Sequence, residues 1–319
     1  MTAIRELLER AMRSALLSLS RRPRLGRLAT RLSLTRSMVE RFVAGETLAE
    51  ALDALDRLRA AGRRTTVDVL GESVQSEASA AAAADRYVEL LDALSGRGLD
   101  GNVSLKLSQM GLDLSPELCR LNAARIFRAA AGTGAFVRID MEDHSKTDST
   151  LAIWRELRAI NPSSGVVIQA GLRRSADDVA ALIAEGAPIR LCKGAYREPA
   201  AVAFPTKDEV DDSYLTLLGR LLREGTSPAL ATHDPRMIQA ATDLVEREGL
   251  GRDQFEFQML YGIRRDLQQQ LVQAGYRVRI YVPYGREWYP YFMRRLAERP
   301  ANVMFLLRSV AREGRRRPS

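Results

Sequence analysis

The stretch Thr65-Thr66-Val67-Asp68-Val69-Leu70 opens a series of short runs that decide the fold. It is rich in β-branched and apolar residues, which is typical of a buried strand. Further runs of this kind follow at 102–107, 136–141, 166–169, 189–193, 229–233, 255–260 and 277–282. Each run is followed by a segment whose apolar residues have helical spacing. Eight strand–helix units predict a closed (β/α)8 barrel of the TIM type, an α/β fold.

A doubly wound open sheet is the alternative for this alternation. Sheets that bind dinucleotides carry Gly-x-Gly-x-x-Gly after the first strand. Here Gly71 is followed by Glu72-Ser73-Val74, which lacks that spacing. We therefore expect a barrel over residues 61–307. Residues 1–60 are predicted to be a helical segment packed outside it, and residues 308–319 a basic tail.

The net charge of +8 resides at the two ends of the 319-residue chain. Residues 1–41 hold ten arginines against three acids, and residues 308–319 hold five against one, so the middle carries 33 basic and 36 acidic residues. The basic ends predict either contact with anionic lipid or nucleic acid, or simply solvated arginines, and we favour the second. The middle lacks a basic patch interleaved with aromatics, so we expect no nucleic-acid partner.

The cysteine and histidine content bounds the compartment and the metal chemistry. Two cysteines without paired spacing indicate a reducing compartment, and we expect a cytoplasmic protein. Two histidines argue against a His-rich zinc site, and we predict no metal, although a site built from carboxylates stays open. No apolar run reaches the length that spans a bilayer.

Polar residues gather where the predicted strands end. In TIM-type barrels the active site lies at this edge. Buried charge is costly without a partner, so a dense polar set there indicates chemistry. The set is Glu72, Lys106, Asp140, Glu142, Gln169, Arg190, Lys193, Thr232, His233, Gln258 and Tyr281.

Two cations in this set have alternative interpretations. Lys106 is a charge in an apolar strand, and we expect it to pair with Asp140 at the next strand end. Arg190, in Arg190-Leu191-Cys192-Lys193-Gly194-Ala195-Tyr196, would contact a phosphate or redox ring, or else pair with Asp140. After the sixth strand, Asp234 is predicted to cap a helix that begins at Pro235, and such a helix start is a natural anion site.

The predicted last helix of the barrel carries Tyr291, Arg294, Arg295 and Glu298 at positions i, i+3, i+4 and i+7, which share one face. Paired guanidiniums are suited to binding a small carboxylate in a bidentate way. The alternative is a solvated face with an Arg–Glu ion pair.

Taken in order from about residue 65 to residue 303, these segments resemble the proline dehydrogenase family of flavoenzymes. The resemblance rests on stretches 68–72, 104–108, 138–143, 167–170, 190–196, 231–234, 255–260 and 279–283 and on the Tyr-x-x-Arg-Arg-x-x-Glu helix. It implies a distorted barrel that binds FAD without a covalent bond. It implies oxidation of L-proline to 1-pyrroline-5-carboxylate, the first step of proline catabolism to glutamate, with electrons passed to a quinone or another acceptor.

The same resemblance assigns roles to residues. It places Asp140 and Arg190 in catalysis, with the Arg190 charge stabilising the reduced, anionic flavin. Glu72 would pair with one helix arginine and gate the pocket, and Tyr291 would favour proline over 4-hydroxyproline. The implied substrate pocket consists of Lys106, Leu260, Tyr281, Tyr291, Arg294, Arg295 and Glu298. The implied FAD site consists of Met141, Gln169, Arg190, Lys193, Gly194, Ala195, Tyr196, Thr232 and His233.

Two other functions stay open at this point. One is a metal- or Schiff-base-dependent lyase that uses Asp140 with Lys106 or Lys193. The other is a non-catalytic barrel attached to a membrane or nucleic acid through its basic ends. Some members of the resembled family fuse an aldehyde dehydrogenase domain, and we expect this chain to be monofunctional. Its basic ends would favour peripheral contact at the inner face of a membrane.

Overall fold

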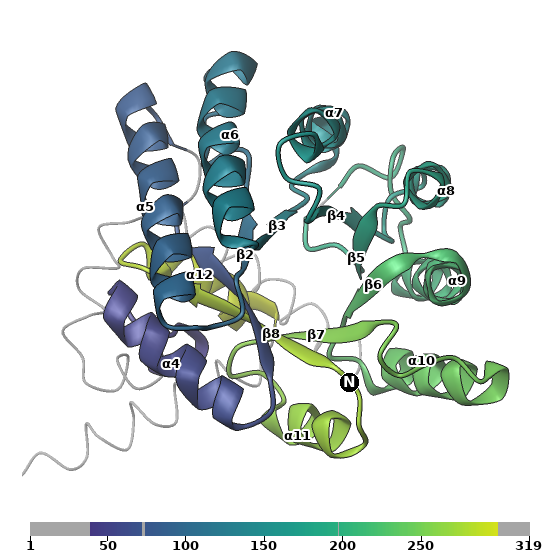
Figure 1. The fold of residues 1–319 in the computed structure, drawn as a ribbon. Helices are drawn as coiled ribbons and strands as arrows, with labels where there is room; N and C mark the ends of the chain where they lie inside the picture. The colour runs from purple at the N-terminus through teal and green to yellow at the C-terminus, as the bar shows by residue number, and fades with distance from the viewer. Residues whose placement is uncertain (1–38, 72–73, 197, 299–319) are drawn as a thin grey trace, which may run out of the picture.

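The computed structural model describes residues 39–71, 74–196 and 198–298. Within them, eight parallel strands form a closed barrel in sequence order, with β1 paired to β8 (Figure 1). The strands are β1 (Arg64–Val69), β2 (Asn102–Leu105), β3 (Phe136–Ile139), β4 (Ser164–Gln169), β5 (Pro188–Cys192), β6 (Thr226–Ala231), β7 (Glu256–Leu260) and β8 (Val278–Tyr284). The prediction of a (β/α)8 barrel is confirmed.

Helices surround the strands, and Figure 1 shows α5 to α11 arranged around the barrel in chain order. Several begin at a side chain that accepts a backbone N–H, as Ser76, Ser115 and Thr206 do. Asp234 caps α10, with Pro235 at its first turn, as predicted. The helices are α4 (Leu48–Ala60), α5 (Glu77–Gly96), α6 (Pro116–Thr133), α7 (Thr147–Arg158), α8 (Ser175–Ala184), α9 (Lys207–Glu224), α10 (Pro235–Glu248), α11 (Arg265–Gln273) and α12 (Trp288–Glu298), and a 3-10 turn, η1 (His144–Lys146), precedes α7.

Two helices distort the regular arrangement. Helix α4 packs against β1 and β8, outside the barrel. Helix α12, which follows β8, packs with residues 39–43, with Leu70 after β1 and with Ile263 after β7. These contacts place α12 beside the carboxyl ends of the strands. The chain thus brings its last described helix to the edge where the polar residues gather.

Two strands are shorter than predicted. The runs 102–107 and 136–141 leave the sheet at Leu105 and Ile139. A turn begins directly after β2, where the N–H of Gln109 donates to the carbonyl of Lys106 at 3.2 Å. Lys106 and Asp140 therefore stand on the segments that follow the strands rather than within them.

The inner wall of the barrel is unusually polar. Strand alternation turns one set of residues outward to the helices, and this set includes Val67, Val103 and Phe257, all fully buried. The residues between them point inward, and many are polar yet buried. They are Thr66, Asp68, Ser104, Arg138, Arg190, Glu256, Gln258 and Arg279.

The described residues contain no helix long and apolar enough to cross a membrane. They also contain no group of three or more histidine, cysteine, aspartate or glutamate side chains arranged to hold a metal ion. Residues 1–38 and 299–319, which hold nearly all of the two basic ends, lie outside the described residues.

Candidate active site

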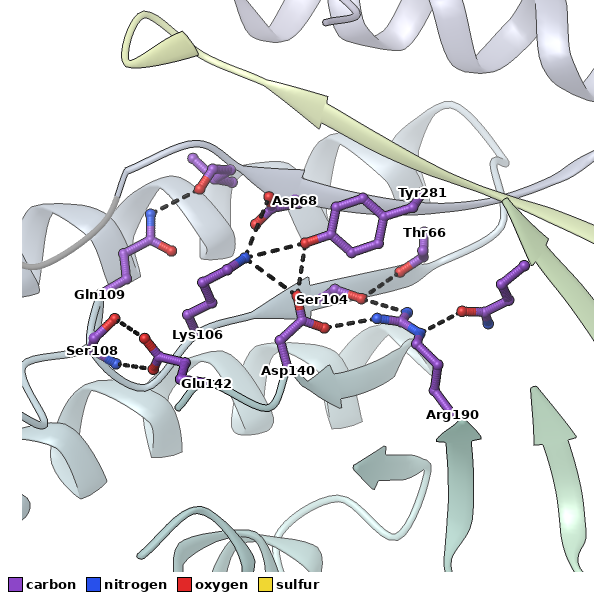
Figure 2. A network of polar contacts seen from close by, with 12 residues as sticks. Thr66, Asp68, Ser104, Lys106, Ser108, Gln109, Asp140, Glu142, Arg190 and Tyr281 are labelled. Atoms are coloured by element: carbon purple, nitrogen blue, oxygen red, sulfur yellow. Dashed lines mark hydrogen bonds and ion pairs between the residues drawn. The ribbon is translucent and has the colours of Figure 1, made fainter. Parts of the chain in front are cut away.

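Asp140 is the hub of a polar network at the carboxyl ends of the strands (Figure 2). Its Oδ2 accepts from the Tyr281 hydroxyl at 2.7 Å and from Lys106 Nζ at 3.3 Å. Its Oδ1 accepts from Arg190 Nη1 at 2.7 Å. Burial would raise the pKa of Asp140, but the charges of Lys106 and Arg190 outweigh it and lower that pKa. The carboxylate is therefore ionised and shared by three donors.

Lys106, just after β2, and Tyr281, in β8, complete the hub. Lys106 Nζ lies 3.7 Å from Asp68 Oδ2 and 3.3 Å from the Tyr281 oxygen. Burial, reinforced by the Asp140 charge, raises the pKa of Tyr281 well above its ordinary value, so the phenol stays neutral. Because its one proton is donated to Asp140, the Tyr281 oxygen is left to accept from Lys106.

Arg190 is held by three separate partners. Its Nη2 donates to Ser104 Oγ at 2.8 Å, its Nη1 to Asp140, and its Nε to Gln258 Oε1. These bonds use three of the five guanidinium N–H groups. The guanidinium carbon also lies 5.3 Å from the centre of the Tyr281 ring. The expected pair Lys106–Asp140 is present, and so is the Arg190–Asp140 pair, which was the alternative to contact with a phosphate or redox ring.

A second buried contact ties the ends of β2, β3 and β4 together. Glu142 accepts from the backbone N–H of Ser108 at 2.9 Å and from its hydroxyl at 2.5 Å. Gln169 Nε2 donates to the Glu142 carbonyl at 2.7 Å. Gly194 lies beside Gln169 with a φ of +106°, and a Cβ there would meet Gln169 Oε1 at 3.2 Å. Glycine fits both the backbone angle and the close approach.

Lys193 lies at the end of β5 between two carboxylates. Its Nζ donates to Asp211 at 2.5 Å and to Asp234 at 2.8 Å. Burial would raise the pKa of Asp211, but Lys193 and Lys207 lower it to about 2. After the neighbouring strand, His233 Nε2 accepts from the Leu260 N–H at 2.9 Å, so the neutral ring carries its proton on Nδ1.

The remaining predicted site residues fall into four groups. Tyr291 is buried in the same apolar cluster that Leu260 packs against. Met141 and Thr232 are buried at strand ends, whereas Gly194, Ala195 and Tyr196 are exposed beyond β5. Arg294, Arg295 and Glu298 lie on α12, but their side chains, like all of Glu72, are outside the described residues.

The network also contains residues that the sequence did not single out. Asp68 lies beside Lys106, and Ser104 joins Arg190 to Thr66, whose hydroxyl is 3.0 Å from that of Ser104. The available signal was parity: Thr66 and Asp68 are two apart in β1 and so face the same side. A polar residue at every second position of a buried run indicates a polar inner wall.

Most of the chain is similar in sequence to one protein family. The family model described as proline dehydrogenase matches residues 51–308. Proline dehydrogenase of Deinococcus radiodurans is 41% identical over 309 residues, which cover 95% of this chain and 99% of the relative. Proline dehydrogenase 1 of Bacillus subtilis subsp. natto is 43% identical over 279 residues, which cover 88% of this chain and 92% of the relative.

Solved structures give the same fold. Proline utilization A from Bdellovibrio bacteriovorus, inactivated by N-propargylglycine, is 30% identical with a TM-score of 0.76 and matches 82% of this chain. Proline utilization A from Corynebacterium freiburgense is 25% identical with a TM-score of 0.72 and matches 95%. The chain spans only 32% and 34% of those two proteins. The match over residues 51–308 and the near full-length relatives show that the chain belongs to the proline dehydrogenase family.

Proposed function

We propose that this protein oxidises L-proline to 1-pyrroline-5-carboxylate, the first step of proline catabolism to glutamate, with FAD as the hydride acceptor. The observation that carries the proposal is the Asp140 hub, in which one ionised carboxylate holds Lys106, Tyr281 and Arg190 at the strand ends. Such a hub fits a small polar substrate that must be oriented against a cofactor. Membership of the family supplies the identity of that substrate.

The residues at the ends of β3 to β6 fit a flavin cofactor. A flavin site needs a cationic donor near the ring and backbone that can approach closely. Arg190 offers a buried guanidinium with N–H groups beyond the three that are bonded. Gly194 offers the close approach, beside Gln169. Met141, Gln169, Lys193, Ala195, Tyr196, Thr232 and His233 are the other proposed contacts.

The proposed cofactor would supply the two-electron redox chemistry when it is bound. Arg190 would place positive charge where negative charge develops on reduction. Asp140 accepts from Nη1 and Ser104 accepts from Nη2, so the guanidinium is oriented before the reaction. Lys193 and the start of α10 would serve the anionic part of the cofactor.

The substrate would lie between the hub and α12. The ammonium of Lys106 disfavours a second positive charge beside it, which favours the neutral form of a substrate amine. Leu260 and Tyr291 belong to an apolar cluster that suits the carbon ring. Arg294 and Arg295, next along α12, are the proposed partners of the substrate carboxylate, with Glu298 and Glu72 completing the pocket.

The visible spectrum of the purified protein tests the proposal directly. A yellow protein that bleaches on addition of L-proline without oxygen would support both the cofactor and the substrate. A yellow protein that L-proline does not bleach would keep the flavin and contradict the substrate, and hydroxyproline would be tried next. A protein that stays colourless after refolding with FAD, and that borohydride traps with an aldehyde substrate, would favour a Schiff-base lyase instead.

Tyr291 is proposed to disfavour 4-hydroxyproline by crowding the substrate ring. The Tyr291 side chain is 6% exposed and packs in the apolar cluster that α12 forms with residues 39–43, Leu70 and Ile263. It therefore has little room to move aside. Replacing it in Tyr291→Ser should raise the use of hydroxyproline relative to proline. An unchanged ratio of the two kcat/KM values would refute this role.

The proposed electron acceptor is a quinone, reached by peripheral contact with the inner face of a membrane. The support is the concentration of arginines at the two ends of the chain. A protein trimmed of residues 308–319 should bind anionic liposomes less tightly, with the difference shrinking at high salt. Equal binding by the trimmed and full chains would contradict a docking role for that end.

A further inference from the structure

A row of inward-facing side chains connects Arg190 to the far side of the barrel. Strand register aligns Arg190 of β5 with Ala229 of β6, and Ala229 with Glu256 of β7. Gln258 lies two residues beyond Glu256 and therefore faces the same way. In β8 its register partner is Arg279. Because β6 contributes only alanine at the aligned position, Arg190 can reach across it to Gln258.

The orientation of the Gln258 amide is dictated by its neighbour. Its Nε2 donates to Glu256 Oε1 at 2.5 Å. An ionised carboxylate only accepts, so the amide nitrogen must face Glu256 and the amide oxygen must face Arg190. That oxygen accepts from Arg190 Nε. The two ends of one side chain are thus matched to an anion and a cation.

Glu256 is in turn fixed by Arg279. Arg279 Nε donates to Glu256 Oε1 at 2.7 Å, and its Nη1 donates to the Thr65 carbonyl at 2.7 Å and to Asp100 at 2.6 Å. Burial would raise the pKa of Glu256, but the Arg279 charge outweighs it and lowers that pKa. The carboxylate is therefore ionised, which the orientation of Gln258 requires. The chain of contacts ends at the Thr65 carbonyl and at Asp100, which precedes β2 near the amino ends of the strands.

We propose that Gln258 is a positioning residue that fixes the plane of the Arg190 guanidinium for the proposed flavin reaction. Asp140 and Ser104 hold the two Nη atoms, and Gln258 holds Nε. Three hydrogen bonds to one rigid planar group, added to its covalent attachment through Cδ, restrain its position and tilt more tightly than two would. The proposal rests on the proposed function, because it concerns a charge that acts on the cofactor.

The Gln258→Met variant tests the proposal, since methionine has a similar length but makes no strong hydrogen bond. Without the Nε anchor the positive charge is less well placed, and the reduced flavin should lose affinity relative to the oxidised flavin by roughly tenfold. For a two-electron couple this lowers the midpoint potential by about 30 mV. Spectroelectrochemistry of the FAD-loaded protein, without proline, gives the value.

Asn122→Leu is the matched control. Asn122 is a buried amide on α6 that donates to the Met110 carbonyl at 3.1 Å, away from the row. Loss of the Asn122 hydrogen bond should lower the unfolding temperature as much as Gln258→Met does. The midpoint potential of the flavin should stay at the wild-type value. A potential that is unchanged in Gln258→Met, or lowered equally in both variants, would overturn the proposal.

A double-mutant cycle with Glu256→Gln separates orientation from mere packing. The neutral amide no longer dictates which end of Gln258 faces Arg190, so this variant should lower the potential by less than Gln258→Met does. Once Gln258 is gone, Glu256→Gln can act only through the loss of its own negative charge, which raises the potential, so the double variant should not lie below Gln258→Met. Fully additive shifts would show that the two residues act separately.

A second readout does not depend on flavin. In protein labelled with 15N-arginine, the Arg190 Nε–H resonance is assigned from its absence in Arg190→Lys. Its exchange with water should accelerate at least about tenfold in Gln258→Met and hold steady in Asn122→Leu. If the wild-type protein binds no FAD, the proposed function fails while this exchange test still decides whether Gln258 holds Arg190.

Discussion

The barrel contains two largely buried ionic networks that differ in their position and in how their charges are paired. The upper network, Asp140 with Lys106, Tyr281 and Arg190, lies at the carboxyl ends of the strands. The lower network, Arg279 with Glu256 and Asp100, lies towards the amino ends. In the upper one a single carboxylate serves three donors, whereas in the lower one a guanidinium is shared by two carboxylates and a carbonyl.

The different positions of the two networks indicate different roles, one in catalysis and one in stability. Lys106 and Asp140 stand on segments that have left the sheet, where they can meet a substrate, while Glu256 and Arg279 lie within strands. Residues at the carboxyl edge of such barrels carry catalysis, and residues at the opposite edge carry stability. Changes in the upper network should therefore act mainly on turnover, and changes in the lower network mainly on unfolding.

The largest effect is expected from Asp140→Asn. The substitution leaves the Lys106 and Arg190 charges without the carboxylate that places them, so kcat/KM for proline should fall by about 10²-fold or more. The free energy of unfolding should also fall, by about 3 kcal/mol, because buried Arg190 loses its carboxylate and Lys106 loses Asp140 while keeping Asp68 at 3.7 Å. Steady-state kinetics and urea unfolding measure the two quantities.

Asp100→Asn is the matched control from the lower network. Asp100 is 44% exposed at its side chain, so solvent replaces much of what the substitution removes. Its kcat/KM should stay close to the wild-type value. Equal losses of turnover in the two variants would erase the distinction between the networks.

The second largest effect is expected on stability, from Glu256→Gln. The folded-state pKa of Glu256 is below its ordinary value of 4.5, so its contribution is complete above about pH 4.5 and is lost as the pH falls through the folded value. At pH 7 the variant should unfold with about 3 kcal/mol less free energy. The gap from wild type should narrow as the pH falls below about 4.5. Urea unfolding over that range checks the sign, and a gap that widens in acid would contradict it.

Much of this arrangement was predictable from the sequence, for identifiable reasons. Buried parallel strands are short apolar runs, so eight runs predicted eight strands. Lys106 follows β2 and Asp140 follows β3, and successive strands are neighbours in a barrel, so their contact could be predicted.

What escaped prediction depends on register and packing between distant segments. The link from Gln258 to Arg190 spans 68 residues and requires that an alanine occupy the strand between them. The contact of α12 with Leu70 and Ile263 depends on packing that helical spacing does not encode. The early ends of β2 and β3 could not be predicted because apolar residues just beyond them continued the strand pattern.

A smaller effect is expected from Tyr281→Phe. The variant keeps the ring beside Arg190 but removes the hydroxyl between Asp140 and Lys106. One hydrogen bond to a charged group contributes about 1.5–3 kcal/mol, part of which Asp140 recovers from its other donors. We expect kcat/KM to fall by about tenfold. Tyr214→Phe is the control, since this buried hydroxyl has no hydrogen-bond partner among the described residues, and its loss should leave kcat/KM unchanged.

The smallest effect is expected from Thr66→Val, at the outer limit of the upper network. Arg190 donates to Ser104 Oγ, which leaves the Ser104 proton for Thr66. Valine keeps the shape and removes only this last acceptor, so unfolding should lose about 0.5–1.5 kcal/mol and kcat/KM should change by less than about threefold. Ser104→Ala removes a direct partner of Arg190 and should lower kcat/KM more. Equal losses of kcat/KM in the two variants would mean that the hydroxyl pair acts on Arg190 as one unit, and the upper network would then extend through Thr66 into the wall of the barrel.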